Sequence, residues 1–448
     1  MLLDARYRKC YDSALIGSGG RRALRPNLQA QNGIKMTSPS RFHYGWVILV
    51  MGIFVIFGSL GMGRVAYSMV LPAMQSGLGM DNTQAGALAT ANLISYLGLA
   101  VLGGAIAARY GPRTLIAAGL AVAVVGMVLT GLSNSVVTAA LWRTLTGVGS
   151  GASNVPMMAL LAAWFATRRR GQAAGITTVG TSLAMIFAGS MVPLLLSIYG
   201  TDGWRVSWFV FGGATMAVAA AAFLLLRNWP SEKGLAPMGA NPGDSIPKLG
   251  GGGLPWGKVY GNRRVWHLGL VYTAYGFSYI IYMTFFTKHL IVQGGYTQVD
   301  AGRLFMIVGW VSLPCGLLWG TVSDVIGRKR ALIIVYLVHA VAFSMFSLWP
   351  TTPGFTLSAV LFGLSAWSIP AIMAAACGDV LGARLAPAAL GFITLFFGLG
   401  QAVAPVVAGA MADATGSFFP AFLLAGGAAL LGAIGAFTLR SSAPVHGD

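Results

Sequence analysis

The chain has 448 residues, of which 56% are hydrophobic and 9% are charged. A soluble globular protein carries about 25% charged residues, so this composition excludes a protein whose whole surface faces water. The formal net charge of +18 does not indicate a nucleic-acid ligand, because a membrane protein places its basic residues in loops that face anionic lipid.

Twelve apolar segments follow one another along the chain, and each is long enough to cross a membrane as a helix of about 20 residues. They lie at residues 44–71, 83–108, 114–133, 136–164, 173–199, 204–226, 265–288, 302–323, 331–349, 355–379, 387–412 and 417–439. A membrane barrel would instead show alternating segments of about ten residues. We therefore expect an all-α integral membrane protein with twelve transmembrane helices.

A polar stretch rich in proline and glycine separates the first six segments from the last six. The basic N-terminal region has no apolar signal-peptide core, and we expect it to be disordered; Met36 is an alternative translation start to Met1. The expected organisation is a tail at 1–43, an N-lobe at 44–226, a linker at 227–264, a C-lobe at 265–440 and a second tail at 441–448.

The basic residues are distributed unequally between the two ends of the spans. Most of the 29 Lys and Arg residues fall in the N-terminal tail, the linker and the loops on that same side. The opposite short loops near 72–82, 134–135, 350–354 and 413–416 contain none. Because cytoplasmic loops carry the excess of Lys and Arg, we expect both termini of this multi-pass protein on the cytoplasmic side of a bacterial inner membrane.

Both halves carry a related loop signature, and the first glycines of the two copies lie half a chain apart. A parallel repeat of six helices is typical of a two-lobed transporter. The first copy contains Gly104, Arg109, Gly111 and Arg113, and the second contains Gly320, Asp324, Gly327, Arg328 and Lys329.

At these residues the chain resembles the major facilitator superfamily, whose mark is the loop Gly-x-x-x-Asp-Arg/Lys-x-Gly-Arg-Arg/Lys. The stretch RTLTGVG from Arg143 is similar to the family motif Arg-x-x-x-Gly-x-Gly, and WFATRRRGQAAG and GWRVSWFVFGG also look like family features. HYGWV, GRVAYSMVLPAM and WGTVSDVIGRKRAL resemble bacterial facilitators near the monocarboxylate and oxalate carriers. The resemblance covers residues 42–440 and implies secondary transport by alternating access, without a cofactor.

The second loop copy predicts a latch. Asp324 can accept hydrogen bonds from Arg328 and from the N-terminus of a neighbouring helix, and so hold the lobes together on the inside. The first copy has Ala108 at the position of the acid and lacks this anion. We expect conformational or coupling roles for both loop copies and for Arg143; the alternative is that the basic residues only fix topology.

The charged residues inside the spans favour an anionic substrate. None of the eleven acidic residues falls in the middle of a span, so a cation would have no counter-ion. Arg64 and Arg143 instead lie in the outer half of spans without an acid at comparable depth. A buried guanidinium costs several kcal/mol unless it is satisfied, and at Arg64 we expect a substrate carboxylate to satisfy it, with carbonyls or water as the alternative.

Tyr272, Tyr275, Tyr279 and Tyr282 recur on one helical face and predict a cavity wall, or else a packing stripe. Further polar candidates for the substrate site are Asn92, Trp310, Trp367 and Gln401, with Asn154, Thr177 and Thr181 beside them, although each alone also suits an interhelical hydrogen bond.

No nucleophile–base cluster, phosphate loop or metal-ligand spacing is present, and the three cysteines form no close pair. We therefore expect no enzyme, metal or cofactor, but a monomeric transporter of a small organic anion such as a monocarboxylate, with or without a co-transported proton. The alternatives are an exporter of drugs or hydrophobic metabolites and a non-transporting membrane receptor or scaffold.

Overall fold

The computed structural model describes residues 42–240 and 256–439, and within these ranges it contains helices but no strands, only an isolated bridge between Phe165 and Met238. The first half comprises α1 (Gly45–Ile56), η1 (Phe57–Val65), α2 (Tyr67–Leu78), α3 (Asn82–Tyr110), α4 (Pro112–Gly131), α5 (Val136–Trp164), α6 (Thr167–Thr177), α7 (Val179–Tyr199), η2 (Gly200–Asp202), α8 (Gly203–Leu225) and η3 (Pro230–Lys233). The second half comprises α9 (Trp256–Tyr260), α10 (Arg263–Val292), α11 (Gln298–Ser312), α12 (Cys315–Ile326), α13 (Arg328–Leu348), α14 (Thr352–Ser365), α15 (Ser368–Thr415) and α16 (Phe419–Phe437).

Helices occupy each of the twelve expected spans. By length and composition, eight helical segments of the described residues can cross a membrane, or nine when the bent pair α11 and α12 counts as one span. One of these segments runs over Arg168–Leu225 and contains both α7 and α8. Helices α3 and α5, each of 29 residues, are about 44 Å long and also suffice to span a bilayer.

Several spans are broken where the sequence predicted continuous helices. The first consists of α1, η1 and α2, and the eighth is bent by 43° between α11 and α12. The segment α15 consists of two helices that meet at a kink at Gly382, where φ is 74°, and its two parts belong to the separate tenth and eleventh spans Thr352–Gly382 and Ala388–Thr415, as expected. Residues 1–41 and 441–448 of the expected tails and residues 241–255 of the expected linker lie outside the described residues.

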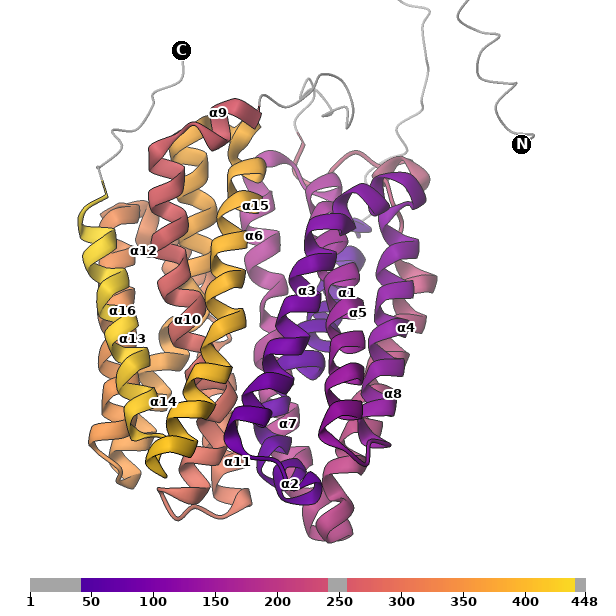
Figure 1. Ribbon diagram of the computed structural model, residues 1–448. Coiled ribbons are helices and arrows are strands. Elements are labelled where there is room, and N and C mark those ends of the chain that lie inside the picture. Colours follow the sequence, from indigo (N-terminus) through magenta and orange to yellow (C-terminus); the bar gives the residue numbers. More distant parts are fainter. Residues whose placement is uncertain (1–41, 241–255, 440–448) are drawn as a thin grey trace, which may run out of the picture. The chain divides into compact units, whose positions relative to one another are not determined.

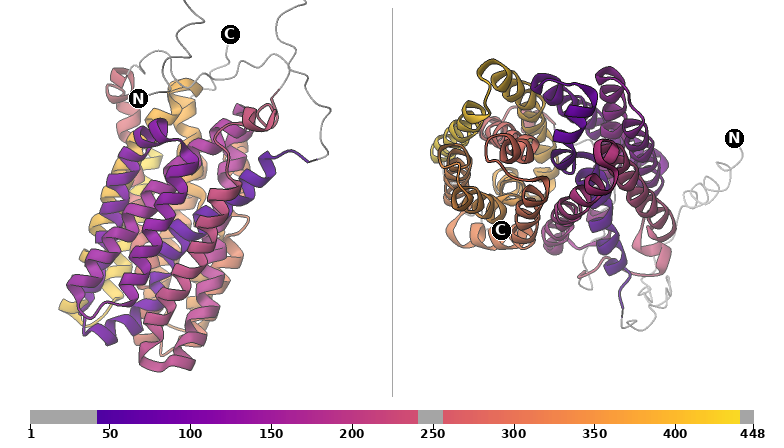
Figure 2. Two further views of the ribbon diagram at one scale, coloured as in Figure 1. Left: turned by 90° about the vertical axis from the view of Figure 1, so that its right-hand side faces the viewer. Right: turned by 90° about the horizontal axis from the view of Figure 1, so that it is seen from below.

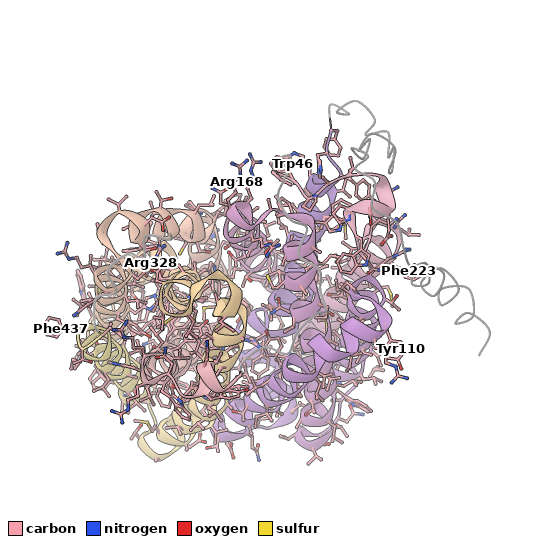
Figure 3. The ribbon with its side chains drawn as sticks, turned by 90° about the horizontal axis from the view of Figure 1, so that it is seen from above. Trp46, Tyr110, Arg168, Phe223, Arg328 and Phe437 are labelled. Atoms are coloured by element: carbon pink, nitrogen blue, oxygen red, sulfur yellow. The ribbon has the colours of Figure 1, made fainter. Side chains whose placement is uncertain are left out.

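The helices α1 to α8 gather in one group and α10 to α16 in another, which we call the N-lobe and the C-lobe (Figures 1 and 2). Across the interface, α3 packs against α15, α7 against α11, and α2 against α10. We call the end of the bundle where α1 begins and α16 ends the terminal end, and the opposite one the far end. Viewed from the terminal end, Arg328 lies over the C-lobe and Arg168 over the N-lobe (Figure 3).

Two glycines at corresponding turns of the lobes have backbone angles that other residues rarely adopt. Gly111 precedes α4 with φ 84° and ψ 140°, and Gly327 precedes α13 with φ 87° and ψ 148°. A side chain in this region of φ and ψ is strained, so glycine permits the sharp reversal between consecutive spans. The repeated glycine of the loop signature is therefore required by the backbone.

Gly327→Ala is expected to lower the free energy of unfolding by about 1–3 kcal/mol, because alanine must adopt a positive φ there. Gly320→Ala is the matched control: a Cβ at this helical glycine meets no atom within 4 Å, and alanine favours the helix. Thermal unfolding of the two purified variants should separate them. Equal melting temperatures would contradict the assignment of strain to Gly327.

Candidate substrate site

A cavity of about 240 Å³ lies between the two lobes. Its wall is built by η1, α3 and α5 of the N-lobe and by α10 and α15 of the C-lobe, with contributions from neighbouring segments. Among the residues that the structure describes, no Asp or Glu lines it, whereas Arg64 and Arg143 both do. The cavity wall therefore carries positive charge without an acidic counter-ion.

Arg64 reaches the cavity from a stretch of π-helix, η1, in which the chain is wound more widely than in an α-helix. The stretch packs closely on α7, since a Cβ at Gly61 would collide with that of Ala184. Such stretches of π-helix are rare and occur frequently at functional sites. The glycines of FGSLGMGRV thus allow the wide turn and the close contact that together direct Arg64.

The Arg64 guanidinium is only partly satisfied by the protein. Its Cζ lies 4.4 Å from the centroid of the Tyr96 ring, and the Tyr279 hydroxyl lies beside it. Its Nε and Nη2 atoms are buried and have no hydrogen-bond partner among the described residues. Buried donors of this kind are costly unless a ligand or water pairs with them, so Arg64 is suited to bind an anion.

Arg143 has partners that Arg64 lacks. Its side chain is 1% exposed, and Nη1 donates a 2.7 Å hydrogen bond to the carbonyl oxygen of Gly63. The Cζ atom lies 4.8 Å from the centroid of the Tyr67 ring and 5.0 Å from that of Trp208. Its Nε atom is buried without a hydrogen-bond partner among the described residues, so Arg143 is only partly paired, but Nη1 ties it to the residue that precedes Arg64.

Three of the four tyrosines on α10 line the cavity. Tyr275 and Tyr279 stack with ring centroids 4.6 Å apart, and Tyr272 stacks on Phe397 at the same distance. Tyr282 lies about 15 Å beyond Tyr272 along the helix, away from the lining, in an aromatic cluster of the C-lobe core. The face that the spacing predicted is thus divided between cavity and core.

Trp367 lines the cavity, and its indole N–H donates a 3.2 Å hydrogen bond to Ser182 of the other lobe. The structure does not bring the remaining three candidates to the cavity wall. Asn92 is buried and donates to the carbonyl oxygen of Arg143, and Gln401 donates to the Tyr279 hydroxyl from behind the wall. Trp310 is 56% exposed, whereas the preceding residue, Gly309, is the one that packs against Ser182 and Ile186 of α7.

Tyr96 is a cavity residue that the sequence analysis did not name. It lies alone in an apolar stretch of α3, without a repeat or a charged neighbour to single it out. Asn154 of α5 also lines the cavity and donates a 2.7 Å hydrogen bond from Nδ2 to the Tyr96 hydroxyl. Only the folded structure identifies Tyr96, because its ring lies against Arg64 and its hydroxyl bonds to Asn154.

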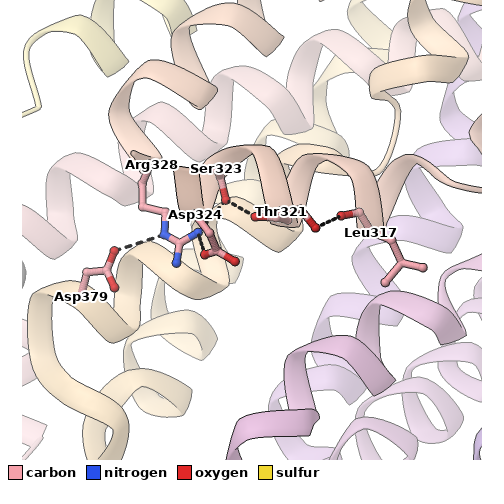
Figure 4. A network of polar contacts seen from close by, with 7 residues as sticks. Leu317, Thr321, Ser323, Asp324, Arg328 and Asp379 are labelled. Atoms are coloured by element: carbon pink, nitrogen blue, oxygen red, sulfur yellow. Dashed lines mark hydrogen bonds and ion pairs between the residues drawn. The ribbon is translucent and has the colours of Figure 1, made fainter. Parts of the chain in front are cut away.

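The second loop copy forms the expected ion pair and adds a partner (Figure 4). Arg328 lies 2.5 Å from a carboxylate oxygen of Asp324 and 3.2 Å from one of Asp379, and it also donates to the hydroxyl of Ser323. These residues belong to α12, α13 and α15, so the observed network braces the C-lobe. The latch between lobes that the sequence predicted for Asp324 is not among these contacts.

The first loop copy makes different contacts. Arg113 donates to the carbonyl oxygen of Phe223 at 2.8 Å from Nε and 2.6 Å from Nη2, which ties α4 to the end of α8. Arg109 lies over the ring of Tyr110, as Lys329 of the second copy lies over that of Phe437. Gly104 lies within α3. Carbonyl and aromatic groups thus contact these cations.

The lobes are joined at the far end by a carboxylate. Asp413, near the end of α15, accepts hydrogen bonds from the backbone N–H and side-chain Nδ2 of Asn82, at 3.0 and 2.8 Å. It also accepts from the backbone N–H and hydroxyl of Thr83, at 2.7 and 2.5 Å. Gln298 of the C-lobe donates to the carbonyl oxygen of Met69 nearby, at 2.8 Å. The far end is therefore held closed.

An all-helical membrane protein with two lobes, a cavity between them and a closed far end has the architecture of a secondary transporter. The family model of the Major Facilitator Superfamily matches this chain over residues 49–369 and 289–447. The chain belongs to this superfamily, whose members are transporters and not enzymes.

Two curated relatives match most of the chain. The protein named "Probable sulfoacetate transporter SauU" of Cupriavidus necator is 27% identical over 82% of this chain and 87% of its own length. The "Hexuronate transporter" of Bacillus subtilis is 24% identical over 86% and 92%. A crystal structure of a bacterial homologue of the human lysosomal transporter Spinster, inward-facing and unoccupied, has a TM-score of 0.68 at 15% identity, covering 88% and 97%.

Proposed function

We propose that this protein carries a small organic anion, such as a monocarboxylate, across the inner membrane as a monomer that works by alternating access. The proposal depends on Arg64, a cation in the interlobe cavity. Among the described residues, two of its buried nitrogens have no hydrogen-bond partner and no acid lines the cavity wall around it. The relatives named for sulfoacetate and hexuronate transport support it, since both of those substrates are organic anions.

The orientation follows from the charge of the loops. Because the basic loops lie at the terminal end, that end is proposed to face the cytoplasm and the far end the outside. The structure then corresponds to a state closed toward the outside. Transport toward the cytoplasm is the proposed direction, with return of the empty site or exchange of a second anion completing the cycle.

The missing acid also limits how a proton is coupled. A carboxylate in the cavity wall is a common proton site in carriers, and among the described residues none lines this cavity. Exchange of two anions requires no such group, whereas symport would need the substrate, a histidine or a peripheral acid to carry the proton. Transport of a labelled anion into liposomes, with and without an anion inside, distinguishes the two modes.

A thermal-shift screen of the purified protein in detergent tests the proposal, using small carboxylates, sulfonates, sugars, amino acids and cationic dyes. A ligand at about 100 times its dissociation constant stabilises the folded protein by roughly 2.7 kcal/mol. We expect this stabilisation from an organic anion, and we expect Arg64→Ala to abolish it. Arg64→Lys separates charge from geometry, because lysine keeps the charge but loses the planar pair of donors.

Arg303→Ala is the matched control, since this arginine lies on the surface in an ion pair with Asp300. The variant should leave ligand binding unchanged.

A second candidate, export of hydrophobic cations, is favoured by the stacked aromatic wall of Tyr272, Tyr275 and Tyr279. Stabilisation by cationic dyes alone would support that candidate and refute anion transport.

A further inference from the structure

A buried hydrogen-bond acceptor faces the same cavity as Arg64. Asn154 lines the cavity, and its Oδ1 atom is buried without a hydrogen-bond partner among the described residues. Its Nδ2 atom is already committed to the hydroxyl of Tyr96, at 2.7 Å. An unpaired buried amide oxygen is costly, and a donor supplied by a ligand would remove that cost.

Tyr96 joins this acceptor to the cation. The Arg64 guanidinium lies over the ring, with Cζ 4.4 Å from its centroid, while the hydroxyl of the same ring bonds to Asn154. The unpaired donors of Arg64 and the unpaired acceptor of Asn154 are therefore separated by no more than one tyrosine side chain. A single small molecule is long enough to reach both.

Three hydroxyl groups of the cavity wall do not require a donor from the ligand as Oδ1 of Asn154 does. The hydroxyl groups of Thr178 and Thr394 donate to the carbonyl oxygens of Gly175 and Leu390, at 2.6 and 2.7 Å, and remain able to accept from a ligand. The Tyr275 hydroxyl donates to the carbonyl oxygen of Ala366 at 2.7 Å. A hydroxyl group adapts to either a donor or an acceptor, whereas the Asn154 Oδ1 atom accepts only.

We propose that the substrate is a hydroxy acid, in which the anionic group binds Arg64 and a hydroxyl group donates to Oδ1 of Asn154. This inference rests on the proposed function and makes the substrate class narrower. A plain carboxylate or sulfonate would pair with Arg64 but leave the amide oxygen unpaired. A dicarboxylate would bring a second acceptor toward Oδ1, which repels it. Asn154 is thus the residue that selects the hydroxyl group.

Pairs of anions that differ by hydroxyl groups test the proposal on the full-length protein in detergent. The probes are lactate against propionate and gluconate against hexanoate, with malonate as a dicarboxylate, and dissociation constants are measured by ligand-dependent thermal stability. In the wild-type protein at least one hydroxy acid should bind about tenfold or more tightly than its partner, because a buried acceptor left unpaired is costly. Equal affinities within both pairs, or tightest binding of malonate, would overturn the proposal.

Asn154→Leu conserves the size of the side chain and removes the acceptor, so it should reduce the preference within a pair to about onefold. Asn154→Ala serves the same purpose if the leucine variant does not fold, because alanine also lacks the acceptor. Arg303→Ala is the control outside the cavity and should retain the preference. A preference that survives in the Asn154 variants would assign hydroxyl recognition elsewhere.

The two levels of the proposal fail separately. Arg64→Ala should weaken both members of each pair by the same factor, because the charge is common to them. Equal affinities within the pairs combined with this loss would refute hydroxyl recognition and leave anion transport standing. Absence of binding by every anion would refute both.

Discussion

Substitution of Arg143 by alanine is expected to reduce transport at least about 100-fold, because this guanidinium holds the segment that carries Arg64. The side chain holds the carbonyl oxygen of Gly63 at 2.7 Å, and Gly63 immediately precedes Arg64 in the π-helix η1. Truncation leaves that carbonyl and a large buried space unfilled, which costs about 2–5 kcal/mol. The segment that directs Arg64 would then lose its fixed position.

Uptake of the anion identified by the thermal-shift screen, measured in liposomes at equal protein content, gives the result. Arg143→Lys should be intermediate, since an ammonium group can reach one carbonyl but cannot stack as a plane on Tyr67 and Trp208. Arg205→Ala is the control: this arginine also donates to carbonyl oxygens and lies 4.4 Å over a tryptophan ring, but outside the cavity. Wild-type transport by Arg143→Ala would refute a positioning role.

The two intramembrane arginines show how far the sequence alone can lead. Both are isolated cations in the outer halves of N-lobe spans, and hydropathy assigns them the same cost. They differ in a carbonyl oxygen 80 residues from Arg143: Gly63 accepts from its Nη1 atom. Nε and Nη2 of Arg64, like Nε of Arg143, have no hydrogen-bond partner among the described residues. Partners that meet only in the folded chain leave no local pattern.

The spans were predictable for the opposite reason. A helix that spans a bilayer needs about 20 apolar residues in succession, so each span can be predicted from a local stretch of the sequence. The face that a helix turns toward a cavity cannot be predicted in this way, as the exposed position of Trp310 and the core position of Tyr282 demonstrate. In a membrane protein both the lipid-facing and the packed faces are apolar, and periodicity cannot distinguish them.

The loop signature lies between these cases. Gly111 and Gly327 could be read from the repeat, because a positive φ requires glycine wherever the turn occurs. The ion pair of Asp324 with Arg328 is likewise local, four residues apart on the chain. Asp379, the additional partner of Arg328, lies 51 residues further along the chain, so neither the motif nor the spacing predicted it.

Replacement of Asp413 by alanine is expected to shift the protein toward the state that is open at the far end. Its carboxylate accepts four hydrogen bonds from Asn82 and Thr83. Asp413 belongs to α15 of the C-lobe, and these two residues form the first turn of α3 in the N-lobe. The group is exposed to solvent, so we expect a cost of about 1–2 kcal/mol, equivalent to a shift of roughly 5- to 30-fold between the two states.

Reaction of a cysteine introduced by Ser68→Cys with a membrane-impermeant maleimide measures this shift, in a background without the three native cysteines. Ser68 is 1% exposed and contacts Thr287 across the lobe interface, so it reacts only when the far end opens. Asp81→Ala is the matched control, because Asp81 caps the same helix α3 from within its own lobe. Faster labelling should occur with Asp413→Ala alone; equal rates in the two variants would mean that the carboxylate stabilises α3 without holding the lobes together.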